Sequence, residues 1–220
     1  MIITIDGPAG AGKSTVARGL ASRLEFEFLD TGAMYRTVAW ACLDRGVDLS
    51  DQDAVAKTAE SLSLNFEGDS VFCDGQEVTK AIRTAESSEA ASIVAAVPAV
   101  RSEMVRLQRD AAAGRNVVSE GRDQGTIVFP DADCKFFVTA DPKERAVRRH
   151  AELTAKGQDV SLDEVLQQIV DRDERDRTRK IAPLVVPENA IEVDTSGNGP
   201  DEVIRQLEAT AREKLGLSET

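Results

Sequence analysis

The stretch Gly7-Pro8-Ala9-Gly10-Ala11-Gly12-Lys13-Ser14 matches the pattern G-x-x-x-x-G-K-[ST] in full. The apolar run Ile2–Ile5 before it predicts a strand, and apolar residues recur at helical spacing from Lys13 to Leu24 after it. Gly19 in this helix indicates close packing, because glycine otherwise costs about 1 kcal/mol there relative to alanine. A strand, a glycine-rich turn and a helix in this order predict a phosphate-binding loop, with backbone N–H groups and the helix dipole directed at phosphate oxygens.

The residue types in this loop indicate that it binds a nucleoside triphosphate. The Lys13 ammonium can reach the β- and γ-phosphates of a nucleoside triphosphate, and the Ser14 hydroxyl can ligate Mg²⁺. The loop therefore predicts that a nucleoside triphosphate binds with Mg²⁺, and we expect this nucleotide to be ATP. The residues expected to bind ATP are Gly7, Pro8, Ala9, Gly10, Ala11, Gly12, Lys13, Ser14, Thr15 and Arg148.

The rest of the chain alternates short apolar runs with helical patterns, which is typical of a parallel sheet flanked by helices. The five runs predicted as strands are 2–5, 26–29, 116–119, 134–138 and 190–193. We expect one α/β domain of the three-layer P-loop NTPase type, with a central five-stranded parallel sheet. Residues 62–78 differ, since short strand patterns with turns at 67–70 and 74–76 predict a small hairpin-rich insert.

Composition excludes several classes of function. The chain has 220 residues, 41% of them hydrophobic, and a net charge of −12, which argues against a general nucleic-acid binder and against docking on anionic membranes. Cys42, Cys73 and Cys134 are too few and too scattered for a disulfide framework or a zinc site, and His150 is the only histidine. The N-terminal apolar run is too short for a signal peptide and no stretch approaches 18 apolar residues, so we expect a cytoplasmic protein. We also expect a monomer.

The nucleotide-binding classes can be narrowed further. A regulatory GTPase carries an Asn-Lys-x-Asp base reader, but this chain has no Asn-Lys dipeptide, and its Asp-x-x-Gly at 194–197 comes too late for a switch. Phosphoryl transfer to a small acceptor remains, and it requires a second positively charged site facing the γ-phosphate.

Positive charge is concentrated in residues 143–180, which hold ten Lys or Arg and nine Asp or Glu, a local net of +1 in a chain of −12. Two charged helices are predicted here, around 156–159, and Ser161 with Glu164 forms a capping box that opens the second. Such helices are commonly solvated faces with internal ion pairs. Beside a phosphate loop we favour a lid, whose guanidiniums bind phosphate and exclude water. The side chains that share a face are Arg145, Arg148 and Arg149 in the first helix, and Arg172, Arg175, Asp176 and Arg179 in the second.

Five blocks of sequence together resemble the bacterial cytidylate kinases, which phosphorylate CMP and dCMP. They are ITIDGP at 3–8, DTGAMYR at 30–36, AAVPAVR at 95–101, GRDQGTIVFPDA at 121–132 and RDERDRTR at 172–179. The resemblance implies a core of about 1–35, 102–143 and 181–220, a monophosphate-binding insert of about 36–101 and a lid of about 144–180.

The resemblance also implies site residues. The carboxylate of Asp123, with Arg101, would read cytosine, because it accepts from the N4 amino group and would repel the O4 of uracil. The residues implied to bind CMP are Thr31, Arg36, Ser92, Arg101, Arg122, Asp123, Arg172, Asp176 and Arg179. Those implied to act in catalysis are Lys13, Arg122, Arg172 and Arg179.

Two positions depart from many relatives. Thr31 stands in place of a serine and keeps the hydroxyl, and Ser119-Glu120 stands where some relatives have Ala-Asp, which leaves an indirect Mg²⁺ role for Glu120 open. The expected reaction is transfer of the ATP γ-phosphoryl group to CMP or dCMP, without a general base because the acceptor oxygen is already anionic. The alternatives are another small-molecule kinase on this fold and a non-enzymatic nucleotide switch.

Overall fold

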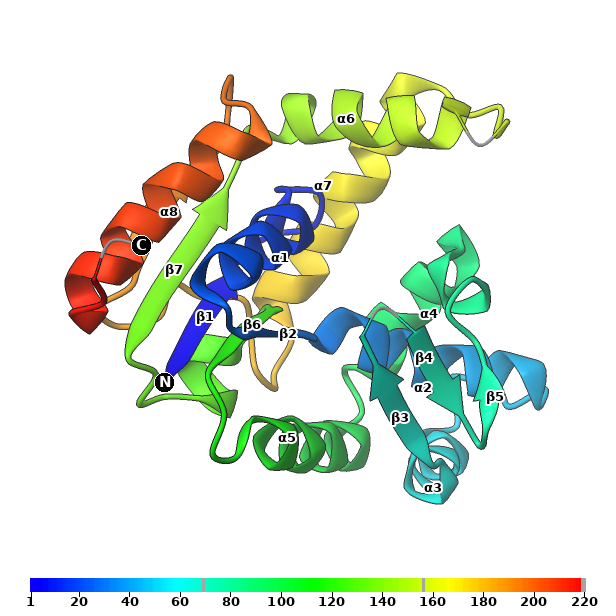
Figure 1. Cartoon of the computed structure of the whole chain (residues 1–220). Helices are drawn as coiled ribbons and strands as arrows, with labels where there is room; N and C mark the ends of the chain where they lie inside the picture. Colours follow the sequence, from blue (N-terminus) through cyan, green and yellow to red (C-terminus); the bar gives the residue numbers. More distant parts are fainter. Residues whose placement is uncertain (69, 156, 219–220) are drawn as a thin grey trace. The chain divides into compact units, whose positions relative to one another are not determined.

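A computed structural model describes residues 1–68, 70–155 and 157–218 of the chain (Figure 1). Asp69, in the turn expected at 67–70, and Lys156, in the segment expected to join the two charged helices, lie outside the described residues. The chain divides into two compact units, one formed by 1–29 with 112–220 and the other by 30–111.

The first unit is built on a five-stranded sheet in the order β2-β6-β1-β7-β8 (Figure 1). Strand β1 pairs in parallel with β6 and β7, and β7 pairs in parallel with β8. The bounds are β1 Ile2–Asp6, β2 Glu27–Asp30, β6 Val117–Gly121, β7 Cys134–Thr139 and β8 Ile191–Asp194. Each overlaps one predicted run, so the expected five-stranded parallel sheet is confirmed.

Two helices, α1 (Lys13–Leu24) and α8 (Pro200–Leu215), pack together against this sheet (Figure 1). Aliphatic side chains of β1, β7 and both helices form one buried cluster. The prediction of close packing at Gly19 is confirmed, because a Cβ built on Gly19 would lie 2.4 Å from Cδ1 of Ile204. A larger residue there would require the Ile204 side chain to shift.

The two charged helices, α6 (Pro142–Ala155) and α7 (Leu162–Thr178), form a helical hairpin in the same unit. Their contact is a small apolar cluster, and the predicted capping box is present: Glu164 N–H donates to Ser161 Oγ at 3.2 Å, and Ser161 N–H donates to Glu164 Oε2 at 2.8 Å. The predicted face of α7 needs a correction, since Arg175 is exposed while Asp173 is buried. Packing against the core has turned α7 so that Asp173 replaces Arg175 on the inner face.

The second unit consists of helices packed beside a three-stranded antiparallel sheet in the order β3-β4-β5. The sheet confirms the predicted hairpins, and Asp74 and Gly75 make the β4–β5 turn with φ values of 50° and 80°. The elements are α2 Thr31–Asp44, α3 Gln52–Ser61, β3 Leu64–Glu67, β4 Ser70–Cys73, β5 Gln76–Glu77, η1 Ala81–Arg83 and α4 Ala85–Val94, followed by α5 Pro98–Ala112.

Among the helices in the described part of the chain, none combines the length and the apolar character that spanning a bilayer requires. All three cysteines are described, and they are buried and outside any disulfide.

Candidate active site

The phosphate loop leaves the carboxyl end of β1 and bends on glycine. Gly7 has φ 148°, and a Cβ built on it would lie 1.9 Å from the carbonyl oxygen of Val138 in β7. Gly10 and Gly12 also have positive φ, 74° and 80°, and Gly12 is the residue before α1. The loop can therefore follow this path against the sheet only with glycine at these positions.

Lys13, the first residue of α1, is buried beneath this loop with 5% of its surface exposed. Its Nζ donates a hydrogen bond to the carbonyl oxygen of Pro8 at 2.8 Å. Burial, together with the charges of Arg122 and Arg172, lowers the pKa of Lys13 to about 7, although Glu120 and Asp176 act in the opposite direction. Arg122 and Arg172 lie close enough to Lys13 to disfavour its charge, and a bound anion would relieve this repulsion.

This depressed pKa predicts proton uptake when ATP binds. At pH 8 the Lys13 amine is largely neutral in the free protein, and the phosphates of a bound nucleotide raise its pKa and restore the charge. We expect uptake approaching one proton at pH 8 and almost none at pH 6, where the amine is already charged. Affinity for ATP should fall by up to about tenfold per pH unit above 7. Isothermal titration calorimetry in buffers of different ionisation enthalpy measures the uptake, and equal heats at pH 8 in all buffers would contradict it.

Ser14 and Glu120 form the second polar pair at the loop. The Ser14 hydroxyl donates to Glu120 Oε1 at 2.6 Å, and Glu120 lies in β6 opposite Ile5 of β1, with 5% of its surface exposed. A hydroxyl and a carboxylate are hard oxygen donors of the kind Mg²⁺ prefers. Within residues 1–68, 70–155 and 157–218 no group of three or more His, Cys, Asp or Glu could hold a metal ion by itself. The pair therefore fits a Mg²⁺ ion that is held largely by nucleotide phosphates and water.

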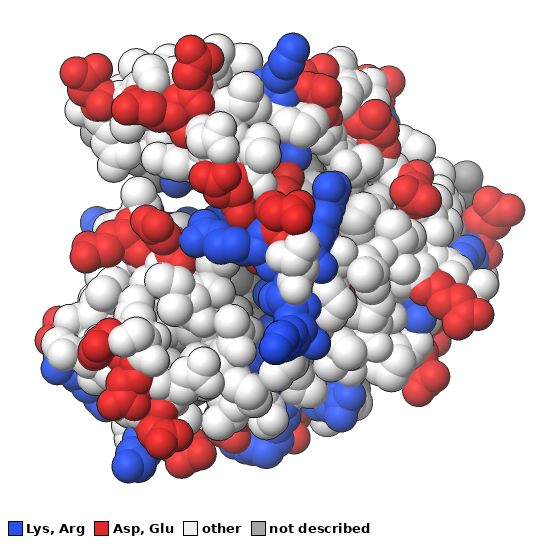
Figure 2. All heavy atoms as spheres, turned by 180° about the vertical axis from the view of Figure 1, so that it is seen from behind, with Lys and Arg blue, Asp and Glu red and all other residues white. Residues whose placement is uncertain are grey.

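Cationic side chains gather around Asp176 on the inner face of α7. Arg122, which follows β6, donates from Nε to Asp176 Oδ2 at 2.9 Å, and Arg179 lies 3.8 Å from the other carboxylate oxygen. Burial alone would raise the pKa of Asp176, but the surrounding guanidiniums, Arg172 among them, outweigh burial and lower it. The structure thus brings the four residues expected to act in catalysis into one electrostatic neighbourhood. Figure 2 shows basic side chains gathered in a band on one face of the protein, with acidic ones at its borders.

Arg145 has a role that its helical pattern did not indicate. Its side chain is 2% exposed and binds three segments: Nε donates to Ala140 O at 3.0 Å, one terminal nitrogen to Ala9 O of the phosphate loop at 2.8 Å, and the other to Asp173 Oδ2 of α7 at 2.6 Å. This guanidinium joins the loop to the helical hairpin. No sequence signal could have paired it with a carboxylate 28 positions away.

Arg148 reaches the loop through Thr195. It donates to the Thr195 carbonyl oxygen at 2.8 Å and to the Thr195 hydroxyl at 3.2 Å, and this hydroxyl donates to Ala11 O at 3.3 Å. Thr195 follows β8 and was missed by sequence reasoning. Thr15, the last expected ATP contact, lies exposed in the first turn of α1.

Asp123 lies in the turn between β6 and β7 and is 3% exposed. It precedes η2 (Gln124–Val128), a single π-helical turn of a kind found mostly at functional sites. Within the first unit, Asp123 and Arg122 are thus consecutive residues at the carboxyl end of β6, the edge of the sheet from which the phosphate loop also leaves.

The remaining expected acceptor residues lie in the second unit. Arg36 forms an ion pair with Asp30 at 3.3 Å, and Arg101 is 4% exposed, donates to Ala95 O at 3.2 Å and lies 5.7 Å from the centroid of the Tyr35 ring. Thr31, the first residue of α2, is buried, and Ser92 on α4 is half-buried. Tyr35 packs as a buried ring against this arginine.

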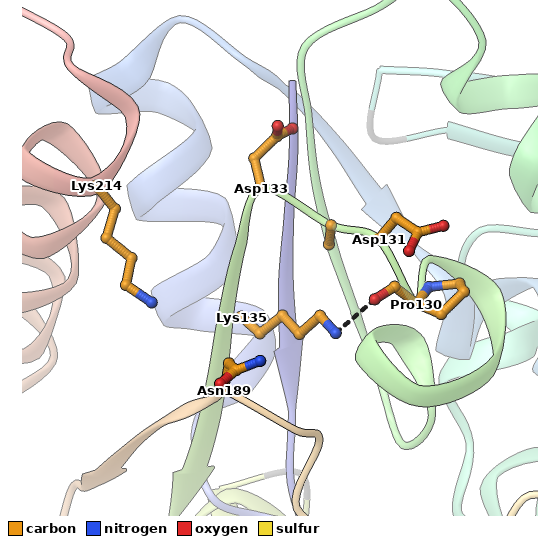
Figure 3. A pocket seen from close by; sticks show the side chains of 7 residues that line it. Pro130, Asp131, Asp133, Lys135, Asn189 and Lys214 are labelled. Atoms are coloured by element: carbon orange, nitrogen blue, oxygen red, sulfur yellow. Dashed lines mark hydrogen bonds between the residues drawn. The ribbon is translucent and has the colours of Figure 1, made fainter.

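A separate surface cavity of ≈ 320 Å³ lies at the amino end of β7, away from the phosphate loop (Figure 3). Lys135 points across it and donates to the carbonyl oxygen of Pro130. The lining residues are Pro130, Asp131, Ala132, Asp133, Lys135, Asn189 and Lys214. Because β7 begins at Cys134 and runs parallel to β1, this cavity lies at the far edge of the sheet from the phosphate loop, and it contains none of the expected site residues.

Comparison with known proteins agrees with this architecture. The family model described as cytidylate kinase matches residues 3–213. Cytidylate kinase of Rhodopirellula baltica is 45% identical over 218 residues, covering 99% of this chain and 95% of that protein, and cytidylate kinase of Pelotomaculum thermopropionicum is 48% identical, covering 94% of each. A solved gluconokinase from Sinorhizobium meliloti shares the fold with a TM-score of 0.50 at 18% identity, covering 98% of this chain and 94% of that one. The chain therefore belongs to the cytidylate kinase family.

Proposed function

We propose that this protein transfers the γ-phosphoryl group of ATP to CMP or dCMP and forms ADP and CDP or dCDP. The observation that carries the proposal is the buried lysine at the phosphate loop, where burial and the charges of Arg122 and Arg172 lower the pKa of Lys13 to about 7. The phosphates of a bound donor and acceptor would bring negative charge to Lys13, Arg122 and Arg172 and would favour the charged form of the lysine.

In the proposed mechanism the chain positions reactants and stabilises charge. The acceptor phosphate oxygen is already an anion, so no side chain has to remove a proton. Lys13, Arg172 and Arg179 would stabilise the charge that spreads over the transferred group, and α6 with α7 would exclude water. Ser14 would ligate a Mg²⁺ ion and Glu120 would hold its water, the ion supplying neutralisation of the β,γ-phosphate oxygens.

The roles proposed for the acceptor residues follow from the resemblance to the family, and the chemistry of cytosine is consistent with them. Asp123 would accept from the cytosine N4 amino group, with Arg101 and Ser92 at the other polar atoms of the base and Thr31 beside them. Arg122 would assist at the base, Arg36 would hold the acceptor phosphate together with arginines of α7, and Arg179 would lie between the phosphates. Asp176 and Arg172 would contact the sugar hydroxyls.

The proposed reaction is tested by incubating the protein with CMP, Mg²⁺ and ATP labelled in the γ-phosphate. The label must appear in CDP, with one ADP formed per CDP. Label that stays in ATP, with nucleotide still bound, would indicate the non-enzymatic switch. Label in the product of an added alcohol such as shikimate, and none in CDP, would indicate another small-molecule kinase.

Asp123→Ala is expected to reduce the preference for CMP over UMP, measured as the ratio of kcat/KM values, by about ten- to hundredfold. The buried carboxylate favours the N4 donor and repels O4, and alanine does neither. Asp131→Ala is a suitable control, because Asp131 lines the cavity at the far end of β7. An unchanged ratio in Asp123→Ala would remove Asp123 from base recognition.

A further inference from the structure

Asp6 is a fully buried carboxylate for which the mechanism above has no use. It is the last residue of β1, directly before Gly7 of the phosphate loop, and is 0% exposed. Oδ1 accepts from the backbone N–H of Gln124 at 2.8 Å, and Oδ2 accepts from that of Gly125 at 2.7 Å. Both oxygens of one side chain are thus committed to two consecutive backbone groups 118 and 119 positions along the chain.

These two N–H groups directly follow Asp123. They open the π-helical turn, and the first N–H groups of any helical turn have no partner within it. The carbonyl oxygen of Asp123 is used as well, accepting from Ile127 N–H at 2.9 Å and Val128 N–H at 3.2 Å. The backbone on the carboxyl side of Asp123 is therefore held at the Asp123 carbonyl and at the next two N–H groups, and the Asp6 side chain binds both of these N–H groups.

Close packing supports the same hold. The Ser119 hydroxyl donates to Gln124 Oε1 at 2.7 Å in the buried interior. A Cβ built on Gly125 would lie 3.0 Å from the hydroxyl of Thr4 and from the ring of Pro187, so a larger residue would fit here only if these neighbours shifted. The π-helical turn η2 therefore packs directly against β1, the strand that precedes the phosphate loop.

Keeping a carboxylate in this place is costly. Burial raises the pKa of Asp6 to about 6, although the two backbone hydrogen bonds lower it in part. Helix starts elsewhere in the chain are capped by half-buried or exposed residues, such as Asp30 and Asp51, each through one N–H. A buried two-point contact is more than capping requires, and it fixes both the position and the direction of the backbone it binds.

We propose that Asp6 is a positioning residue for base selection, which holds Asp123 at a fixed place relative to the phosphate loop by binding the N–H groups of Gln124 and Gly125. This inference rests on the proposed function, in which Asp123 reads cytosine. Strand β1 would then have two roles: it carries the phosphate loop that binds the donor, and through Asp6 it fixes the position of Asp123.

The test is Asp6→Asn, which keeps the size of the side chain but turns an amide NH₂ toward one backbone N–H. We expect the CMP:UMP ratio of kcat/KM to fall by about tenfold or more, mainly through KM for CMP, because a displacement near 1 Å can cost up to about 10²-fold. The KM for ATP should change less than about threefold. Ile3, also fully buried in β1, provides the control: Ile3→Val or Ile3→Ala, chosen to match the loss of Tm, should leave the ratio unchanged.

An Asp6→Asn protein that loses Tm but keeps the wild-type ratio would show a purely structural role and overturn the inference. If Asp6→Asn does not fold, Ser119→Ala removes the second hold on Gln124 and must lower the same ratio. If the wild-type protein prefers CMP and Asp123→Ala loses that preference, but the Asp6 and Ser119 variants keep it, this inference alone is overturned. A wild-type protein with no preference for CMP overturns the proposed function and this inference with it.

Discussion

Lys13→Ala is expected to lower kcat by about 10³-fold or more while the protein stays folded. The ammonium is the charge that lies beneath the phosphate loop, and alanine leaves the transferred group without it. The structural cost is smaller: loss of the hydrogen bond to Pro8 O corresponds to about 1–3 kcal/mol of unfolding free energy, and the buried ammonium that is removed is itself disfavoured by burial. Coupled ADP release measures the first quantity, and thermal unfolding measures the second.

Lys135→Ala is the matched control. Lys135 also donates to the carbonyl oxygen of a proline five residues earlier, Pro130, but at the far end of β7 (Figure 3). The two substitutions therefore remove the same local contact, and only one removes charge from the proposed site. Residual kcat above about a tenth of wild type in Lys13→Ala, or an equal loss in both variants, would contradict the role of Lys13.

Arg145→Met is expected to lower the free energy of unfolding by about 3–5 kcal/mol, because it leaves the buried carboxylate of Asp173 without its charge partner. The effect should shrink in the double variant Arg145→Met/Asp173→Leu, which removes both charges and restores an apolar contact between α6 and α7. Equilibrium unfolding in urea, with the midpoint and slope fitted for the wild type, Arg145→Met, Asp173→Leu and the double variant, gives the four corners of the cycle.

Arg106→Met provides the comparison for an exposed arginine. Arg106 is paired with Glu103 at 2.6 Å and with Asp110 at 2.7 Å, but its side chain is 57% exposed. Its removal should cost no more than about 1 kcal/mol, since water screens such pairs. Equal losses for Arg145→Met and Arg106→Met would show that burial does not decide the strength of the Arg145 contact.

Local patterns account for what could be predicted from the sequence. The glycine-rich loop, the apolar stripe on α1 and the capping box at Ser161 each depend on residues within about one or two helical turns of one another. The close approach at Gly19 is also a local signal, because glycine inside an apolar helical stripe has few other reasons to be there. These features were all confirmed.

Contacts between distant residues could not be predicted in this way. Asp6 meets Gln124, and Ser14 meets Glu120, only because β6 lies beside β1 in the sheet, and strand order is not encoded in hydrophobic period. The inner face of α7 was misassigned for a related reason. Helical spacing groups Arg175 with Arg172, but the buried partner at Arg145 selects Asp173 for the inner face.

The acceptor site came from resemblance to a family rather than from residue chemistry. An Arg-Asp pair after a strand is as compatible with a structural ion pair as with base recognition. The roles of Asp123 and Arg101 at the base stay predictions, as do those of Thr31, Arg36 and Ser92. The burial and contacts of these residues indicate which substitutions would test those roles.

The most direct test of the account is the kcat/KM for ADP release with ATP and Mg²⁺ and, separately, CMP, dCMP, UMP, AMP, GMP and shikimate. The account predicts high values for CMP and dCMP and values lower by at least about tenfold for the other acceptors. A higher value for any of the other acceptors would contradict it, and so would ADP release that does not depend on an acceptor.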